Sequence, residues 1–515
     1  MTLAELITPL DVVEASGDLQ TEVCEVTDDS RQIKEGSLFV AVKGARVDGH
    51  EFTDQALRNG AAGIVMERGA AQDADDEKTK GPTGYRPHGG VRKPVVWVRN
   101  SRYALGLLAS QFYGNPSRSL TMIGVTGTNG KTTVTHLIRA LMQKAGRSPG
   151  LLGTVGYFIG SQSYAAHHTT PGAVELQILL KQMLEAGVDT AVLEVSSHAL
   201  SLDRVAGCEF DVVVFTNLTQ DHLDFHSDME EYFQAKLRLF TDFVEGKQKL
   251  GPKRAIVNLD DERGPRILQE CSIPVWTYGI HADSDIRASD VELFMKGTTF
   301  SVGTPQGPLA IRSQLVGEHN VYNMLAAIGV GLQFGMAPSA IESALQSVEN
   351  VPGRFEQVHQ GQNFSVVVDY AHTEDALLRL LAAANSVKQG RIITVFGCGG
   401  DRYPGKRPKM GQAAVRHSDL VILTSDNPRT EDPLRILQDI EEGILALPSE
   451  DRCEYQVVPD RAKAIERAIQ AARSKDLVLI AGKGHEDYQL VGTRRLDFDD
   501  RQIAKEAILR YRPHE

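Results

Sequence analysis

A glycine-rich segment between an apolar run and an amphipathic run constrains this chain more than any other feature. Residues 124–133 read Gly-Val-Thr-Gly-Thr-Asn-Gly-Lys-Thr-Thr. The preceding residues, 120–123, are mainly apolar, and the following ones place apolar side chains at helical spacing as far as Met142, with Gly146 as the expected stop. A strand, a glycine-rich turn and a helix in this order direct backbone N–H groups and a helix N-terminus at one point, which suits a polyphosphate.

The last residues of this segment, Gly130-Lys131-Thr132, predict binding of ATP and Mg²⁺. Lys131 would place a positive charge on the phosphates, and Thr132 would offer a hydroxyl to the metal. The glycine spacing departs from the standard phosphate loop, which requires glycine where Val125 stands. The alternative is an ordinary glycine-rich strand–helix turn. We favour the phosphate loop, and its predicted ATP-binding residues are Gly127, Thr128, Asn129, Gly130, Lys131, Thr132 and Thr133.

Length and composition predict a cytoplasmic protein of about three domains. The 515 residues carry a net charge of −12 without a basic block, which disfavours nonspecific nucleic-acid binding. Five scattered cysteines lack metal-type spacing and are typical of reduced thiols. We see no signal-peptide pattern at the N-terminus, and no apolar run approaches the ~20 residues of a membrane span. We therefore expect neither nucleic acid nor membrane as a partner.

The first section, residues 1–102, predicts only a small α/β domain. Short strands are expected at 37–44, 62–66 and 95–98. Residues 68–92, rich in Gly, Asp, Lys and Pro, predict a surface excursion.

The second section, residues 103–349, predicts alternating strands and helices, and hence a mainly parallel sheet. Beyond the phosphate loop, strands are expected at 190–195, 211–216 and 254–258, with a β-rich excursion at 284–316. A helix is expected to start with Thr170 as N-cap and Pro171 as first residue, and to close at Gly187.

Polar side chains follow the predicted strands, where parallel sheets bind ligands. Glu194 is the candidate Mg²⁺ carboxylate together with Thr132; the alternative is a solvated or capping glutamate. His198 and His222 are weaker candidates, because a lone histidine is usually structural. Residues 317–323 precede a helix that ends at Gly335, and there Asn320 either caps the helix or contacts a nucleotide with His319 and Asn323.

The third section, residues 350–515, repeats the α/β rhythm. Strands are expected at 365–368, 392–396, 420–423 and 477–480, and each runs into a polar loop: 369–372, 397–402, 425–429 and 482–486. Arg402 and Arg429 in these loops are suited to a carboxylate. The alternative for Arg429 is bracing of the helix that starts at Asp432-Pro433.

Several motifs taken together resemble the Mur ligases of peptidoglycan synthesis, in the right order and over nearly the whole chain. They occupy residues 126–133, 194–198, 317–323, 352–354, 369–372 and 482–486. The resemblance implies an N-terminal domain binding a UDP-linked substrate (1–102), a central ATPase domain (103–349) and a C-terminal Rossmann-like domain binding an amino acid (350–515).

The resemblance also implies a reaction. ATP phosphorylates the γ-carboxylate of a D-glutamyl residue, and the amine of an incoming diamino acid attacks the acyl phosphate, giving amide, ADP and phosphate. Such a ligase would serve cell-wall biogenesis, cell shape and cell division.

Matching positions imply residue roles. The implied catalytic residues are Lys131, Glu194, His222 and Lys236, and the implied metal ligands are Thr132, Glu194, His222 and Lys236 as a carbamate. From the residues alone, Lys236 is a helix-surface lysine. Further ATP contacts would come from His319, Asn320, Asn323, Arg354 and Asp369. Contacts to the UDP-linked substrate would come from Ser30, Thr169, Thr170, Ser197 and Arg204.

The run Asp426-Asn427-Pro428-Arg429 resembles the family members that use meso-diaminopimelate, because lysine users replace the arginine. The implied diaminopimelate-binding residues are Arg402, Asp426, Asn427, Arg429, Gly482 and Glu486. We predict a monomer whose substrates are UDP-N-acetylmuramoyl-L-Ala-D-Glu, meso-diaminopimelate and ATP. The alternatives are the same reaction with L-lysine, a folylpolyglutamate-synthetase-like ligase, and a non-catalytic phosphate-loop scaffold.

Overall fold

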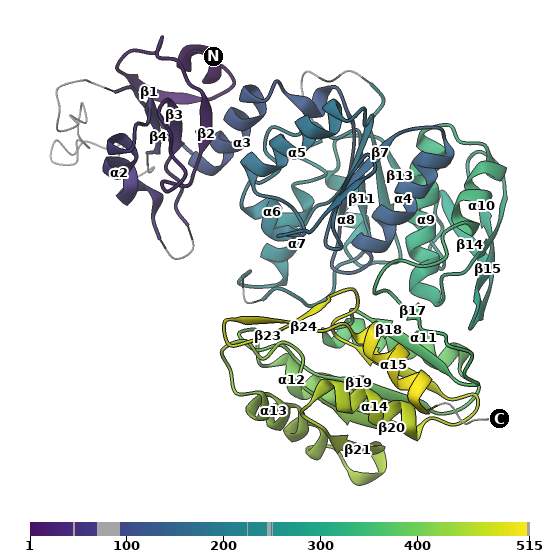
Figure 1. Cartoon of the computed structure of the whole chain (residues 1–515). Helices are drawn as coiled ribbons and strands as arrows, with labels where there is room; N and C mark the ends of the chain where they lie inside the picture. The colour runs from purple at the N-terminus through teal and green to yellow at the C-terminus, as the bar shows by residue number, and fades with distance from the viewer. Residues whose placement is uncertain (45–46, 69–92, 224, 245–248, 250, 512–515) are drawn as a thin grey trace.

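A computed structural model of the chain describes residues 1–44, 47–68, 93–223, 225–244, 249 and 251–511. The described residues form three large sheets, each flanked by helices, and a small hairpin (Figure 1). The predicted α/β class, with a mainly parallel central sheet, is confirmed. The domain boundaries at 102/103 and 349/350 stay a prediction. The excursion expected at 68–92 lies, apart from Arg68, outside the described residues.

The N-terminal sheet has the strand order β1-β5-β4-β3-β2, in which β1 is antiparallel to β5 and the other neighbours are parallel. Its strands are β1 (Val12–Ser16), β2 (Glu25–Thr27), β3 (Ser37–Val40), β4 (Gly63–Glu67) and β5 (Val95–Val98). Its helical segments are α1 (Leu3–Leu6), η1 (Gly49–Phe52), α2 (Thr53–Arg58) and α3 (Ser101–Phe112). The three strands predicted in this section are therefore present, and the first of them ends at Val40.

The central sheet has the order β16-β15-β14-β13-β12-β11-β6-β10-β7-β8-β9. The strands from β7 through β14 in this order are parallel, and both edges continue as antiparallel hairpins. The strands are β6 (Thr121–Thr126), β7 (Pro149–Leu152), β8 (Tyr157–Ile159), β9 (Gln162–Tyr164), β10 (Thr190–Glu194), β11 (Val212–Phe215), β12 (Arg254–Asn258), β13 (Val275–Gly279), β14 (Ile286–Phe294), β15 (Gly297–Gly303) and β16 (Leu309–Ser313).

Helices cover both faces of this sheet. They are η3 (Pro116–Arg118), α4 (Lys131–Lys144), α5 (Ala173–Glu185), α6 (Ser197–Ser201), α7 (Met229–Leu237), α8 (Gly264–Glu270), α9 (Glu318–Gln333) and α10 (Pro338–Gln346). Within β6, Ile123 and Val125 pack in the core with α4, α9 and α10, whereas Met122 packs in the core with α5 and α7. This alternation follows from the two-residue period of a strand.

The C-terminal sheet has the order β17-β18-β22-β19-β20-β21, parallel except for β17. Its elements are β17 (Glu356–Gln357), β18 (Ser365–Asp369), α11 (Glu374–Val387), β19 (Ile392–Phe396), α12 (Lys406–His417), β20 (Leu420–Leu423), α13 (Pro433–Leu445), η4 (Ser449–Asp451), β21 (Glu454–Val457), α14 (Arg461–Ala471), β22 (Leu477–Ala481), the hairpin β23 (Tyr488–Val491) and β24 (Arg494–Asp497), and α15 (Asp500–Tyr511). The polar loops after β18, β19, β20 and β22 consequently share one edge of this sheet.

Two predicted helix starts are wrong. The helix expected at Thr170 begins at Ala173, with Gly172 as its N-cap, because the Thr170 hydroxyl instead donates a hydrogen bond of 2.8 Å to the carbonyl oxygen of Glu194. The N-cap of α9 is Gly317 and not Asn320, which lies inside the first turn. The helix expected to start at Asp432-Pro433 is confirmed: α13 begins at Pro433, and the side chain of Asp432 accepts a hydrogen bond from the backbone N–H of Leu434.

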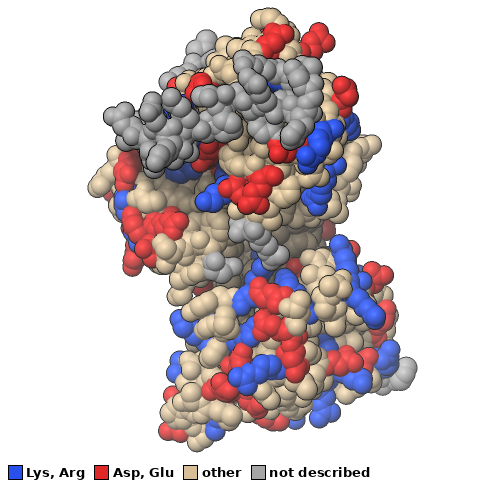
Figure 2. Space-filling model, turned by 90° about the vertical axis from the view of Figure 1, so that its left-hand side faces the viewer, with Lys and Arg blue, Asp and Glu red and all other residues tan. Residues whose placement is uncertain are grey.

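Two further observations bear on partners. Within the described ranges, no helix is both long and apolar enough to cross a membrane. The face in Figure 2 carries acidic and basic side chains interspersed, without a broad basic field.

A buried ion pair holds the C-terminal sheet against its last helix. Arg461 at the start of α14 donates hydrogen bonds of 2.7 and 2.6 Å to Asp500 at the start of α15, and both side chains are fully buried. We expect Arg461→Met to lower the free energy of unfolding by about 3–5 kcal/mol, because it leaves the Asp500 carboxylate buried without a partner. Urea unfolding would measure this. Arg467→Met, an exposed arginine on the same helix, is the control, and an equal effect of both variants would contradict the prediction.

Candidate functional site

The glycine-rich segment forms a loop between β6 and α4, as predicted. Its geometry requires glycine at two positions. Gly127 and Gly130 have φ values of +145° and +88°, and a Cβ atom on Gly130 would lie 2.4 Å from Oδ1 of Asn323. Lys131 is the first residue of α4, and its Nζ donates to the carbonyl oxygens of Gly127 (2.9 Å) and Thr128 (2.8 Å). Burial lowers the pKa of Lys131.

A cavity of about 300 Å³ lies beside this loop and is lined by residues from the central and C-terminal sheets. The predicted ATP-binding residues that line it are Asn129, Gly130, Thr133, His319, Asn323, Arg354 and Asp369. Asn320 does not line it, because its Nδ2 donates to the carbonyl oxygen of Val316 and its Oδ1 accepts from Asn323. Burial raises the pKa of Asp369, which also accepts hydrogen bonds from the backbone N–H groups of Phe355 and Ala371.

Glu194 ends β10 inside the molecule, with an exposed fraction of 1%. One carboxylate oxygen accepts hydrogen bonds from the hydroxyls of Thr132 (3.1 Å) and Thr154 (3.0 Å), and the other accepts from the backbone N–H of Thr154 (2.9 Å). The solvated alternative for Glu194 is therefore wrong. The Thr132 hydroxyl also accepts a hydrogen bond of 3.1 Å from Arg354. A threonine hydroxyl and a carboxylate side by side at the phosphate loop are the oxygen ligands that suit Mg²⁺.

Lys236 is not a surface lysine. Its exposed fraction is 1%, although other residues of α7 are exposed. Its Nζ donates to the carbonyl oxygen of Gly127 (2.9 Å) and lies 4.4 Å from the centre of the Tyr232 ring. Burial, and then the charge of Lys131, lower the pKa of Lys236 well below its ordinary value. A lowered pKa favours the uncharged amine, which is the form of lysine that reacts with carbon dioxide.

His222 lies on the loop after β11 in a left-handed backbone conformation, with φ +55°. Non-glycine residues with this φ are uncommon and concentrate at functional sites. Burial lowers the pKa of His222 to about 4, and its ring packs against that of His198 with centroids 4.8 Å apart. Among the described residues, no group of three or more His, Cys, Asp or Glu side chains could hold a metal ion by itself. A metal here would depend on phosphate oxygens as well.

Four of the five residues predicted to bind the UDP-linked substrate lie together. Thr169 faces the Thr154 hydroxyl at 3.1 Å, Arg204 donates to the carbonyl oxygen of Thr170, and Ser197 is hydrogen-bonded to His226. Ser30 lies apart from them, between β2 and β3 of the N-terminal sheet.

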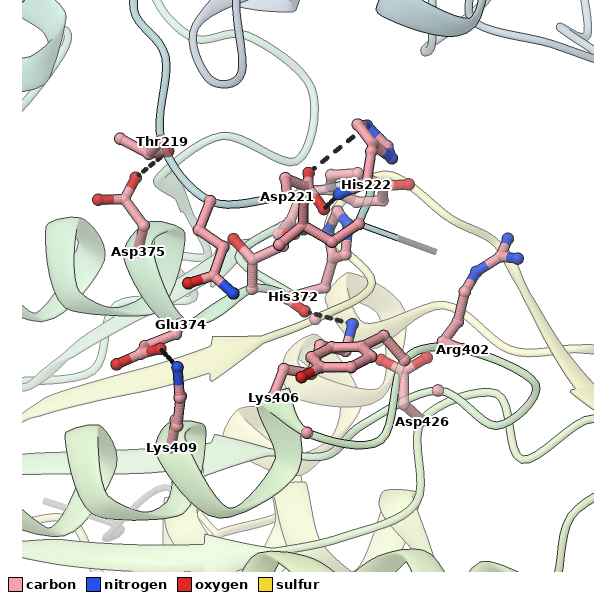
Figure 3. A pocket seen from close by; sticks show the side chains of 18 of the residues that line it. Thr219, Asp221, His222, His372, Glu374, Asp375, Arg402, Lys406, Lys409 and Asp426 are labelled. Carbon is pink, nitrogen blue, oxygen red and sulfur yellow. Dashed lines mark hydrogen bonds and ion pairs between the residues drawn. The ribbon is translucent and has the colours of Figure 1, made fainter. Parts of the chain in front are cut away.

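A second cavity, of about 620 Å³, lies where the loop after β11 meets the loops of the C-terminal sheet (Figure 3). Asp221 and His222 line it from the central sheet. All six residues predicted to bind diaminopimelate line it from the C-terminal sheet: Arg402, Asp426, Asn427, Arg429, Gly482 and Glu486. The prediction that four polar loops converge at one sheet edge is confirmed.

The acidic side of this cavity is built around a fully buried lysine. Lys483 donates to Asn427 Oδ1 (3.2 Å) and to Glu486 Oε2 (3.1 Å), and the Asn427 amide donates to the same Glu486 oxygen (3.0 Å). Asp426 differs from its neighbours: one of its oxygens, Oδ2, is buried without a hydrogen-bond partner in the described structure. A buried, unpartnered carboxylate oxygen is costly unless a ligand donates to it.

The basic side of the cavity consists of two guanidinium groups. Arg429 has φ +53°, and its backbone pairs with the hairpin β23–β24 through Leu490 and Gly492. Its Nη1 donates to the carbonyl oxygen of Gly400 (2.7 Å), so the loops after β19 and β20 hold it jointly. Arg402 is exposed and forms no hydrogen bond or ion pair with other described residues. Arg429 braces these loops rather than the helix that begins at Pro433.

Asp375 joins the two halves of the site. It lies in the first turn of α11, and its Oδ2 accepts hydrogen bonds from Asn129 of the phosphate loop (2.7 Å), from Thr219 (3.0 Å) and from Arg379 (2.9 Å). Asp375 lines the larger cavity and Arg379 the smaller one. The start of α11 therefore forms the wall between the two cavities.

A histidine beside the phosphate loop predicts acid sensitivity. The ring Nε2 of His136 on α4 is buried without a partner in the described structure, and burial, then Arg139, lower its pKa to about 4. Because the unfolded chain binds this proton near pH 6.5, the contribution to stability is complete above that pH and is lost as the pH falls towards 4. We expect His136→Phe to remove about 2 kcal/mol of the stability difference between pH 7 and pH 5. Thermal unfolding at both pH values tests this, and an unchanged difference would contradict it.

Comparisons with known proteins agree with this geometry. Family models described as the Mur ligase middle domain, the Mur ligase glutamate ligase domain and the Mur ligase family catalytic domain match residues 125–331, 353–484 and 22–113. A protein of Bacillus velezensis named UDP-N-acetylmuramoyl-L-alanyl-D-glutamate–2,6-diaminopimelate ligase is 44% identical over 99% of both chains. A protein of Geobacillus thermodenitrificans with the same name is 48% identical over 93% of this chain and 94% of its own. This chain belongs to the Mur ligase family.

Solved structures extend the comparison across this family. A structure titled UDP-N-acetylmuramoyl-L-alanyl-D-glutamate–2,6-diaminopimelate ligase has a TM-score of 0.68 and 30% identity, and the match covers 99% of each chain. The folylpolyglutamate synthase of Mycobacterium tuberculosis has a TM-score of 0.60 at 18% identity, with 79% of this chain and 95% of that one covered. At that identity the second match shows the fold alone.

Several polar residues of this Mur ligase site were not predicted from the sequence. They are Thr154, Asp221, Asn258, Asp260, Tyr322, Asp375, Arg379, Lys406 and Lys483. Asn258 ends β12 and Asp260 follows it, as Glu194 ends β10 and the predicted loops follow their strands, so that signal was available. Asp375 and Lys406 carry no local signal, because each joins the site only through contacts between distant segments.

Proposed function

We propose that this protein is an ATP-dependent amide ligase that adds meso-diaminopimelate to UDP-N-acetylmuramoyl-L-Ala-D-Glu in the cytoplasm, through an acyl phosphate. One observation carries the proposal. The larger cavity lies between the loop after β11, with Asp221 and His222, and an amino-acid-like set of charges formed by Arg402, Arg429 and Asp426. Asp375 in its wall is hydrogen-bonded to Asn129 of the phosphate loop. The names of the full-length relatives, all diaminopimelate ligases, support the same assignment.

The smaller cavity would hold ATP. Lys131 and the N-terminus of α4 would face its phosphates, and the nucleoside would lie between Asn323, Tyr322 and Asp369. Thr132 and Glu194, hydrogen-bonded at 3.1 Å, fit a divalent cation together with phosphate oxygens. Bound Mg²⁺ would neutralise charge on the transferred phosphoryl group. Asp375 and Asn129 would hold the loop in position for the transfer.

Two more groups are proposed as metal ligands on the strength of the family resemblance, His222 and a carbamate of Lys236. The burial of Lys236 and its lowered pKa support carbamylation, because only the uncharged amine reacts with carbon dioxide. The modification would convert a buried amine into an acidic oxygen ligand.

The larger cavity would hold the diamino acid by its far end. Arg402 and Arg429 would bind that end's carboxylate. The unpartnered Asp426 oxygen and the free oxygen of Glu486 would accept from its ammonium. The near-end amine, which attacks the acyl phosphate, would then point towards Asp221 and His222. Positioning of this kind supplies much of the catalysis in reactions with three anionic partners.

The UDP-linked substrate would reach the same place from the N-terminal side. We propose Thr169, Thr170, Ser197 and Arg204 as its contacts near the reacting carboxylate, and Ser30 as a contact with the UDP end. Thr169 lines the larger cavity, which supports this direction of entry.

Phosphate release with UDP-N-acetylmuramoyl-L-Ala-D-Glu and ATP·Mg²⁺ tests the proposal, with meso-diaminopimelate, L-lysine or no amino acid added in parallel. We expect release only with diaminopimelate, accompanied by a tripeptide product in the mass spectrum. Release with lysine alone would keep the ligase and reject its specificity. No release with either would favour a folylpolyglutamate-type ligase or a scaffold, and folate turnover would separate these two.

A further inference from the structure

The cations of the larger cavity do not all have a counter-ion. Four Lys or Arg side chains line it, namely Arg402, Lys406, Lys409 and Arg429. Lys409 is paired with Glu374 at 3.8 Å. Arg402 and Arg429 are the proposed partners of the far carboxylate of the diamino acid. Lys406 is left without an assignment.

Lys406 is the first residue of α12, and it is partly buried. Its Nζ donates one hydrogen bond, of 2.9 Å, to the carbonyl oxygen of His372, and among the described residues it forms no ion pair with a carboxylate. In Figure 3 its side chain points into the space between Asp221 and Arg402. An ammonium group has three donors, so two of them remain for a ligand.

None of the described acidic side chains that line the cavity forms an ion pair with Lys406. Glu486 accepts from Lys483 and Asn427, and Asp375 accepts from Asn129, Thr219 and Arg379. Glu374 pairs with Lys409, Asp221 accepts from the backbone N–H of His222, and Asp426 is the proposed partner of the ammonium at the far end of the diamino acid. A partly buried charge without a partner is unfavourable. Since no described carboxylate of the cavity pairs with Lys406, a substrate carboxylate is the anion that would neutralise it.

We propose that Lys406 is the counter-ion of a substrate carboxylate next to the amide bond that is formed. This inference rests on the proposed function and goes beyond it. Two carboxylates qualify: the α-carboxylate of the D-glutamyl residue, and the carboxylate beside the attacking amine. Neither takes part in bond formation, and Arg402 and Arg429 are already assigned to the far end of the diamino acid.

Lys406 has a simple role in this arrangement. The amine forms a bond to the acyl carbon, phosphate leaves with the bonding electrons, and the amine loses its proton to solvent. Both neighbouring carboxylates would repel the negative charge that builds up on the acyl oxygen and phosphate. A cation on one of them reduces this repulsion, and Lys409, the other cation of α12 that lines the cavity, is already paired with Glu374.

Combining protein variants with substrate analogues tests the pairing. The first analogue is the UDP-linked substrate with its D-glutamyl α-carboxylate converted to a carboxamide. The second is diaminopimelate with a carboxamide in place of the carboxylate beside the attacking amine. Wild type, Lys406→Met and Lys406→Arg would be assayed with each analogue and each natural substrate by phosphate release and product mass. Arg416→Met, an exposed residue in the last turn of α12 that does not line the cavity, is the matched control.

For wild type, we expect amidation of the paired carboxylate to lower kcat/KM by about 10- to 100-fold. In Lys406→Met this penalty should disappear, because amide and carboxylate then face the same uncharged side chain. In Lys406→Arg most of it should remain. Loss of the penalty with the first analogue identifies the D-glutamyl carboxylate, and loss with the second identifies the diamino acid.

An unchanged penalty with both analogues in Lys406→Met would overturn the proposal, even if overall activity falls. So would a Lys406→Met enzyme with wild-type kcat/KM for the natural substrates. If Lys406→Met does not fold, as judged by thermal unfolding, the comparison uses Lys406→Gln. Failure of the proposed function is distinguishable, since wild type would then release no phosphate with the natural substrates.

Discussion

Replacing Lys131 with methionine is expected to lower kcat by about 10²- to 10³-fold, the effect of losing one preorganised charge from a buried reaction centre. Lys131 occupies the first position of α4, and its Nζ is held at 2.9 and 2.8 Å by two carbonyl oxygens of the loop that it closes. These bonds keep the amine where the phosphates would lie. Methionine fills a similar volume without a charge, so the loop should keep its shape while losing its phosphate contact.

The measurement is phosphate release at saturating substrates, together with thermal unfolding to show that the fold is intact. Lys144→Met, at the exposed last position of the same helix, provides a control with the same change of charge. Retention of more than about a tenth of wild-type kcat would assign phosphate binding to the backbone N–H groups alone. We do not expect arginine at this position to support activity, because the planar guanidinium group is larger than the compact ammonium group that the enclosed site accommodates.

Patterns along the chain were enough to find most of this site. In the sequence, a strand that is buried on both faces is a short apolar run, and the point where this run gives way to glycine or polar residues predicts the end of the strand. The strands at Ile392–Phe396 and Leu420–Leu423 were therefore predicted with their correct ends. Because neighbouring strands are parallel, the loops that follow them meet at one edge. Convergence of Arg402, Arg429 and Glu486 in one cavity followed from this rule.

Tertiary contacts explain what the patterns missed. A threonine followed by proline is a good start for a helix, but the hydroxyl of Thr170 is bound to Glu194 of a nearby strand, and the helix starts two residues later than predicted. Lys236 lies on a helix with several exposed residues, and only the approach of the phosphate loop buries it. Asp375 contacts Asn129, which is far away in the sequence. Local propensity contains no information on such contacts.

The second large effect is expected at Arg429, where alanine should lower kcat/KM for diaminopimelate by about 100-fold or more. The guanidinium group is held by the Gly400 carbonyl, and the backbone of Arg429 is paired with the hairpin β23–β24, so the positive charge is positioned before the ligand arrives. Removing it would leave the far carboxylate of the ligand facing Asp426 and Glu486 with Arg402 alone. The KM for ATP should not change, because Arg429 lines only the larger cavity.

Selectivity separates recognition by Arg429 from its bracing of the loops. A lysine substrate has no far carboxylate, so Arg429→Ala should lose little of whatever activity wild type has with lysine, and the preference for diaminopimelate should collapse. Arg402→Ala should shift the preference in the same direction, whereas Arg435→Ala, an exposed arginine on α13, should not. If Arg429→Ala instead lowered activity with both amino acids equally, or left the KM for diaminopimelate unchanged, the arginine would be a structural brace, and specificity would have to come from Asp426 and Glu486.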